Sequence, residues 1–268
     1  MTDPVLAEPF RAAPDVHVIT SHVPVPGLGI LNVNSFLVEG AEPTLIDAGV
    51  PVHRQGFLEA LWSLIDPGQL SWVALTHDDP DHIGSLFSIL EAAQNARLLT
   101  NFASFGRLNL TQPIPPKRVH LINAWERVSV GDRTLTAVQP PLFDNPGTVG
   151  FYDDRSQILF SSDCFGGVLP SMDAAELRDA ADIPAETLSQ GQALWATMES
   201  PWVHHVDRDL YAGSLERIRR IEPAAICSTH LPPVRGRTRQ FVDTLTGVPD
   251  AEVFVPPNQR DLEDMLST

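Results

Sequence analysis

The sequence predicts a single α/β domain whose layers follow an αββα order. Short apolar runs with the length of buried strands alternate with longer segments whose apolar residues recur at helical spacing. The 268 residues, 43% of them hydrophobic, suffice for one good core and leave no room for another large domain. Side chains of metal-ligand type follow several of the predicted strands. Together these observations favour a sandwich that carries a site at the ends of its strands.

The predicted elements follow the chain in a regular order. The first half contains strands at 16–20, 35–39 and 43–47, a helix with the apolar stripe Phe57, Leu58, Leu61, Trp62 and Ile65, a strand at 72–75 and a helix at 83–90. The second half contains strands at 134–138, 150–153, 157–162 and 224–229, a helical segment at 174–198 broken near Ile183 and Pro184, and a helix at 207–221 that buries Leu210, Leu215, Ile218 and Ile221. We predict one domain over 1–268, with a helical insert at about 171–205 and a C-terminal extension at 231–268.

The segment that follows the strand at 72–75 is dense in metal-ligand side chains. Residues 76–82 read Thr-His-Asp-Asp-Pro-Asp-His and so hold two imidazoles and three carboxylates. Rigid elements on both sides would hold these groups at the sheet edge. A solvated acidic turn is the alternative, but mixed ligand types directly behind an apolar strand favour metal binding. The candidate ligands of this run are His77, Asp79, Asp81 and His82.

Three downstream residues also lie where a predicted strand ends. Asp163 follows the strand at 157–162, His230 follows the strand at 224–229, and Asp144 lies in the turn between the strands at 134–138 and 150–153. Taken singly, each has an ordinary alternative as a turn-capping aspartate or a surface histidine. Two cations need more ligands than one loop supplies. This favours a site in which the three downstream residues join the ligand run.

The order of these motifs resembles that of the metallo-β-lactamase superfamily over most of the chain. The motifs are Asn34-Ser35-Phe36-Leu37-Val38, Thr44-Leu45-Ile46-Asp47-Ala48-Gly49, the ligand run, Ser162-Asp163 and Thr229-His230. The superfamily commonly has His-x-His-x-Asp-His in the ligand run, whereas this sequence has Asp79 at the second His position. The flavodiiron and related diiron oxygen-binding proteins have a carboxylate there, so the chain resembles that branch, without its flavodoxin domain. The resemblance implies the four-layer metallo-β-lactamase sandwich.

The resemblance also implies how the ligands divide between two metals. One metal would lie between His77, Asp79 and Asp144, the last at a position where the family usually has His. The turn also offers Asn145 for that position, and the sequence leaves the two alternatives open. The other metal would take Asp81, His82 and His230, and Asp163 would bridge the pair.

The chemistry of this ligand set favours hard cations. With neutral imidazoles, its three His and four Asp carry four negative charges. The position with Asp81, His82 and His230 has the two-His-one-carboxylate composition of open non-haem iron sites, whereas the other is rich in carboxylates. We therefore expect two metal ions with iron first, and manganese or zinc as alternatives.

Four residues are candidates for catalytic roles near the metals. Asp81 is one of them, as a ligand next to the reacting group. His22 precedes a Pro/Gly-rich loop at 24–29 that we expect to arch over the site, and His204 and His205 approach from the helical insert. Imidazoles titrate near neutral pH and suit proton donors, although a supporting or surface role is the common case.

Charge and composition restrict the partners. The net charge of −16 argues against nucleic acid, and with neither an apolar stretch of spanning length nor a signal peptide the sequence predicts a cytoplasmic protein that binds no membrane. About 38 residues follow His230, too few for a flavin domain, so electrons would come from a separate donor protein. A homodimer stays open. Cys164 and Cys227 are expected to be reduced core thiols.

Three functions remain at this point. The first is a diiron protein that binds or reduces oxygen, nitric oxide or peroxide, which the carboxylate at Asp79 favours. The second is a metal-dependent hydrolase in which a bridging hydroxide attacks an ester, lactone, thioester or phosphoester. The third is a gas sensor without catalysis. The ligand of the protein would accordingly be a small molecule or a gas.

Overall fold

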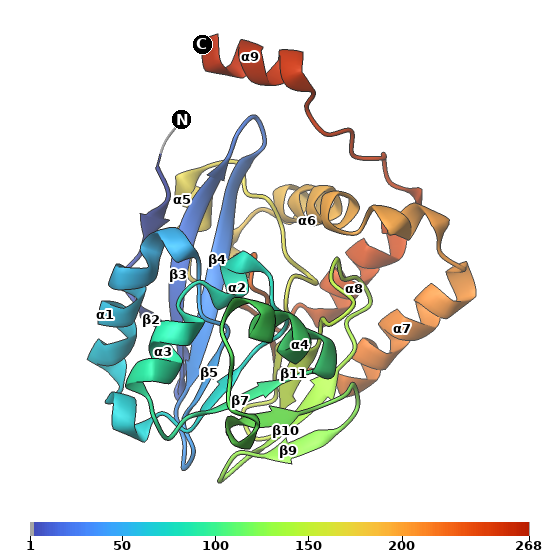
Figure 1. Ribbon diagram of the computed structural model, residues 1–268. Coiled ribbons are helices and arrows are strands. Elements are labelled where there is room, and N and C mark those ends of the chain that lie inside the picture. The colour runs from blue at the N-terminus through green and yellow to red at the C-terminus, as the bar shows by residue number, and fades with distance from the viewer. Residues whose placement is uncertain (1–2, 268) are drawn as a thin grey trace.

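A computed structural model describes residues 3–267 and places two facing β-sheets between two layers of helices (Figure 1). The eight-stranded sheet has the order β1-β3-β4-β5-β6-β7-β8, with β2 paired to β3, and the six-stranded sheet has the order β14-β13-β12-β11-β10-β9. The strands of the first sheet are β1 (Val5–Leu6), β2 (Phe10–Ala13), β3 (Val16–Val25), β4 (Gly29–Val38), β5 (Thr44–Ile46), β6 (Trp72–Ala74), β7 (Arg97–Thr100) and β8 (Val119–Leu121). Those of the second are β9 (Arg127–Ser129), β10 (Thr134–Val138), β11 (Gly150–Asp153), β12 (Ile158–Phe160), β13 (Ala225–Cys227) and β14 (Val234–Arg235).

The helices cover the outer faces of the two sheets. In Figure 1, α1 and α3 lie beside the first sheet, whereas α6, α7 and α8 lie on the side of the second. The helices are α1 (Arg54–Leu64), α2 (Pro80–Ile83), α3 (Leu86–Ala92), α4 (Phe102–Thr111), α5 (Met172–Ala175), α6 (Ala185–Glu199), α7 (Arg208–Ile221), α8 (Thr238–Gly247) and α9 (Gln259–Ser267). Short 3-10 turns include η5 (Pro201–His205). No helix within residues 3–267 combines the length and the apolarity needed to cross a membrane.

Three clusters of buried apolar residues fill the three gaps between the four layers. Consecutive residues of one strand belong to different clusters, because their side chains point to opposite faces of the sheet. Phe36 lies between the sheets with Phe151 and Phe160, whereas Leu37 packs under the helices with Phe57. The third cluster joins the second sheet to α6, α7 and α8. The αββα layering and the single α/β domain are therefore confirmed.

Three details differ from the sequence-based expectation. Leu210 is 76% exposed, and its neighbour Tyr211 is buried instead, because Tyr211, Leu215 and Ile218 share one face of α7 at helical spacing, whereas Leu210 lies off that face. The expected helix at 83–90 is divided into α2 and α3. The segment at 24–29 is the tip of the β3–β4 hairpin, in which Val25 pairs with Gly29, and is not a separate loop.

The C-terminal part of the chain contributes to the second helical layer. Phe241, Val242 and Leu245 of α8 belong to the core cluster that covers the second sheet. Beyond them, the chain leads to α9, which Figure 1 shows apart from the sandwich.

Candidate metal centre

The seven predicted ligands come together where strands of both sheets end. The pairs β5–β6 and β12–β13 are parallel, so the carboxyl ends of the two strands in each pair share one sheet edge. From the first sheet, the ligand run leaves β6, with Asp79 at the N-cap of α2 and both Asp81 and His82 within that helix. From the second sheet, Asp144, Asp163 and His230 follow β10, β12 and β13.

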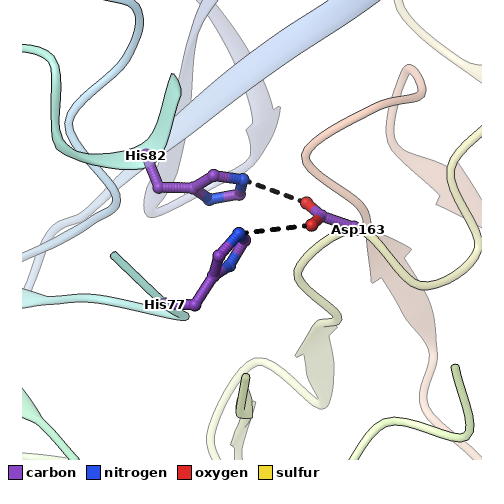
Figure 2. A group of neighbouring side chains, drawn as sticks. All are labelled: His77, His82 and Asp163. Carbon is purple, nitrogen blue, oxygen red and sulfur yellow. Dashed lines mark ion pairs between the residues drawn. The ribbon is translucent and has the colours of Figure 1, made fainter. Parts of the chain in front are cut away.

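Asp163 lies at the middle of the group. Its Oδ1 is 3.0 Å from the Nε2 of His82 and 3.0 Å from the Nε2 of His230. Its Oδ2 is 3.4 Å from the Nε2 of His77. Figure 2 shows the rings of His77 and His82 side by side, each pointing at one of the two carboxylate oxygens. One oxygen of the carboxylate therefore faces His77, and the other faces both His82 and His230.

The other carboxylates divide into two clusters around Asp163. His77, Asp79 and Asp144 offer ligand atoms that all lie within 4.8 Å of one another. The same limit holds for Asp81, His82 and His230. In the second cluster, Oδ2 of Asp81 is 3.6 Å from the Nε2 of His82 and 3.5 Å from that of His230. The same division is the one that the family resemblance implies, and two adjacent metal ions would fit it.

Each imidazole is held through its Nδ1, which leaves its Nε2 for the centre. The Nδ1 of His82 lies 2.9 Å from Oδ2 of Asp47, and that of His230 lies 2.8 Å from the backbone oxygen of Asn32. The Nδ1 of His77 lies 3.1 Å from Oγ of Ser162. Metal-ligating histidines in proteins are commonly oriented in this way through the nitrogen that does not bind the metal.

The backbone conformation at Asp47 and hydrogen bonds from Thr76 fix the position of its carboxylate. Asp47 has a φ of 57°, in the left-handed region that Asp tolerates better than most residues. Its carboxylate accepts hydrogen bonds of 2.8 Å from both the backbone N–H and the hydroxyl of Thr76. The side chain that orients His82 is therefore itself held in place.

Two buried atoms of the centre lack the partner that burial demands. Nε2 of His82 and Oδ1 of Asp163 have no hydrogen-bond partner within the described part of the chain, although they are only 3.0 Å apart. Buried polar atoms in such an arrangement suit a third atom bound to both. The donor set and this geometry fit a metal cation.

The electrostatics of the centre favour positive charge. Burial alone would lower the pKa of His82, but Asp163, Asp81 and Asp47 raise it well above its usual value. Burial alone would raise the pKa of Asp163, but the imidazoles of His82, His77 and His230 hold it well below its usual range. The field that retains a proton on His82 also attracts a metal cation.

Glu199 is a further acidic residue at the centre, and the sequence analysis missed it. It is the last residue of α6, and its carboxylate lies within 4.8 Å of ligand atoms of Asp144 and Asp163. Burial, together with Asp163 and Asp144, raises the pKa of Glu199 to about 10. One sequence feature could have indicated Glu199. It lies at the C-terminus of a predicted helix, where a carboxylate interacts unfavourably with the helix dipole.

Asn145 has a different position from Asp144. Asp144 joins the cluster with His77 and Asp79, whereas the amide of Asn145 donates to Oδ1 of Asp79 at 2.8 Å. Oδ1 of Asn145 accepts from Arg107 at 2.8 Å, and Arg107 also pairs with Asp78. Asn145 thus links Asp79 to α4 and orients that carboxylate.

The three predicted proton donors are not members of the metal-binding clusters found within residues 3–267. His22 is buried in β3, where its Nδ1 lies 3.0 Å from Oδ1 of Asn32. His204 and His205 lie in η5, the former half-buried and the latter exposed. Their catalytic roles, and that of Asp81, stay predictions.

The two cysteines are buried and unpaired, as expected of core thiols. Burial raises the pKa of both Cys164 and Cys227 to about 12. The reactive form of cysteine is the thiolate, so both side chains are inert at neutral pH.

Comparison with known proteins agrees with this fold. A family model described as "ODP family beta lactamase" matches residues 31–230. The chain belongs to this family. A flavo di-iron protein mutant from Thermotoga maritima has the same fold, with a TM-score of 0.78 and 18% sequence identity, over 92% of this chain and 62% of that one.

Two relatives whose names state an activity match part of the chain. A "Rubredoxin-oxygen oxidoreductase" from Megalodesulfovibrio gigas is 27% identical over 172 residues, 63% of this chain and 41% of that protein. A "Nitric oxide reductase" from Moorella thermoacetica is 23% identical over 133 residues, 50% of this chain and 33% of that protein. The chain thus matches less than half the length of these two relatives.

Proposed function

We propose that the protein holds a dinuclear non-haem iron centre that binds and reduces a diatomic oxidant, oxygen or nitric oxide, with electrons from a separate donor protein. The observation that carries the proposal is Asp163, whose two oxygens face imidazoles of two ligand clusters and whose Oδ1 has no hydrogen-bond partner among residues 3–267. A carboxylate placed in this way suits a bridge between two cations. Two relatives, the rubredoxin-oxygen oxidoreductase and the nitric oxide reductase, support the choice of reaction.

The ligand types support iron over zinc. Each cluster contains at least one imidazole and one carboxylate, and the cluster of Asp81, His82 and His230 has the two-His-one-carboxylate composition of open iron sites. Bound iron would supply electrons and an open coordination position for the oxidant. Manganese or zinc would fit the same donors less specifically.

The residues around the centre would hold the imidazole ligands in place and shield them from water. Trp195 packs its ring 4.5 Å from that of His230 and donates a 3.1 Å hydrogen bond to the backbone oxygen of Asp163. His77, His82 and His230 are each at most 1% exposed. The side chains of Asp79 and Asp81 are 37% and 34% exposed, so a small oxidant would reach the centre from the side of these carboxylates.

The donor, the cytoplasmic location and the absence of a nucleic-acid partner stay predictions. Some relatives are named as flavoproteins, for example "Putative diflavin flavoprotein A 2" from Nostoc, but this chain matches only 23% of that protein's length. A separate reductase supplies the electrons in our proposal.

Metal analysis combined with optical spectroscopy tests the proposal. We expect protein purified from its own source to contain two irons per chain, and its reduced form to develop an absorption band when oxygen or nitric oxide is added. A reductant supplied through a small redox protein should then be consumed. Two zinc ions without an optical change would overturn the proposal, and turnover of an ester panel by that zinc form would establish the hydrolase instead. Two irons that bind the gas without consuming reductant would indicate a sensor.

A further inference from the structure

Glu199 occupies a position next to the first ligand cluster that an ordinary surface glutamate would not take. Its carboxylate lies within 4.8 Å of ligand atoms of Asp144 and Asp163, and Asp144 in turn lies within that distance of His77 and Asp79. The two clusters therefore overlap at Asp144. Glu199 comes from the end of α6, an element that contributes none of the seven predicted ligands.

Of the three carboxylates at this point, Asp163 faces the imidazoles of three histidines, whereas Asp144 and Glu199 form no ion pair within residues 3–267. No Lys or Arg forms an ion pair with Asp144, Asp163 or Glu199 in the part of the chain that the structure describes. Glu199 is half-buried and Asp144 is exposed, and a cation bound between the three carboxylates would relieve their mutual repulsion.

Independent features next to Glu199 indicate a ligand. Oδ1 of Asp163, on a side chain only 3% exposed, lacks a hydrogen-bond partner among the described residues although it faces the imidazoles. A small cavity is lined by Asp163 and Glu199 together with Gln192, which is fully buried. The amide of Gln192 donates to the backbone oxygen of Phe165, while its Oε1 is unpartnered within residues 3–267. Buried polar atoms without partners, on residues that line one cavity, indicate a place for a bound ion or water.

We propose that Glu199 is a ligand of the cation held by His77, Asp79 and Asp144. The inference rests on the dinuclear centre proposed above and deepens it. The first position would then have one imidazole and four carboxylates, counting the shared Asp163, whereas the second has two imidazoles with Asp81 and Asp163. Asp144 and Glu199 together take the role that a single imidazole has in the ligand set that the family resemblance implies.

The two positions are therefore unlike in chemistry. Carboxylates suit hard cations such as manganese, whereas imidazoles suit iron and zinc. A position with four carboxylates should select Mn²⁺ or ferric iron over zinc, and the second position should retain iron. Glu199 would thus give the first position a specificity of its own.

Titration of the metal-free protein with Mn²⁺, followed by electron paramagnetic resonance, tests this assignment. We expect wild type to bind two Mn²⁺ ions and to show the spectrum of a spin-coupled pair. Glu199→Gln, which keeps the shape but removes the charge, should weaken one of the two Mn²⁺ ions by at least about 10–100-fold, the loss typical of supporting residues around a metal. The spectrum should become that of one isolated Mn²⁺ ion.

Glu186→Gln is the matched control, because Glu186 is exposed in the first turn of the same helix. It should bind both ions as wild type does. Glu199→Asp retains the carboxylate and should fall between wild type and Glu199→Gln, provided that thermal unfolding shows all variants to be folded.

Two results would overturn the assignment. One is a folded Glu199→Gln variant that binds two Mn²⁺ ions with wild-type affinity and coupling. The other is an equal loss in Glu186→Gln, which would assign the effect to helix α6 as a whole. Neither result touches the proposed function, which fails separately if the natively purified protein lacks iron.

Discussion

Single residues decide the metal preference of this centre, and Asp79 is the first of them. It lies at a position where the metallo-β-lactamase superfamily commonly has His. Its Oδ1 accepts a 2.8 Å hydrogen bond from Asn145. An imidazole there would add a nitrogen ligand and remove a negative charge, both of which favour zinc.

Asp79→His should therefore shift the metal content towards zinc. Competition between Fe²⁺, Mn²⁺ and Zn²⁺ for the metal-free protein, read by elemental analysis, measures the change. Asp173→His, at an exposed acidic position in the first turn of α5, is a control for the mere addition of an imidazole. Unchanged selectivity in Asp79→His would contradict the role given to that carboxylate.

Asp47 acts on the metals through His82. Asp47→Asn keeps a residue that tolerates the positive φ at this position but removes the charge that holds the Nδ1 proton of His82. We expect metal affinity to fall by about 10–100-fold, as is typical when such a supporting residue is lost. Chelator competition measures the affinity, and Glu91→Gln, at an exposed position, serves as the reference. An affinity within the error of wild type would show that His82 needs no such support.

Glu199 makes the stability of the metal-free protein depend on pH. Its pKa in the folded state, about 10, is above the ordinary value of 4.5, so folding favours the protonated form. The stability that it contributes is complete below about pH 4.5 and is lost as pH rises towards about 10. Metal-free Glu199→Gln should consequently unfold at higher denaturant than wild type at pH 8, with the difference shrinking towards pH 5. A difference that does not vary with pH would exclude this explanation.

At the scale of elements, the site was predictable wherever ligand types directly follow an apolar strand. His77, Asp163 and His230 all meet that condition, and parallel strand pairs bring their ends together. Glu199 does not meet it, because it reaches the centre from a helix end and only tertiary packing brings it near Asp144. Leu210 shows a limit for the fold: apolar character alone selected it, whereas Tyr211 has the helical spacing to Leu215 and Ile218 that places it in the core.

Helix α4 supports the ligand run through one side chain. Arg107 pairs with Asp78 and donates 2.8 Å to Oδ1 of Asn145, which in turn holds Asp79. Lysine cannot make both contacts with the planar geometry of a guanidinium. Arg107→Lys should weaken the cation at the first position and leave the second unchanged, which calorimetric titration with Mn²⁺ resolves. Arg127→Lys, in an exposed ion pair, is the control. Equal weakening at both positions would contradict the separate support of Asp79.

At the scale of the whole molecule, the centre joins the two halves of the sandwich. The ligand run leaves the first sheet, whereas Asp144, Asp163 and His230 leave the second. A cation bound to ligands from both sheets connects them in the folded state only, since the unfolded chain does not hold these residues together. Binding therefore adds directly to the stability of the fold.

Metal removal should accordingly lower the thermal unfolding midpoint, and restoring the metals should recover it. With free metal at 100 times its dissociation constant, one site adds about 2.7 kcal/mol to the free energy of unfolding. Hydrogen exchange should report the loss most strongly in β6, β12 and β13, whose ends carry ligands from the two sheets, and least in α1, which packs under the first sheet away from them. Asp163→Asn should reduce the stabilisation by added metal, because it weakens the group between the clusters. Exchange that increases uniformly over all elements would mean that the metals stabilise the fold without connecting its sheets.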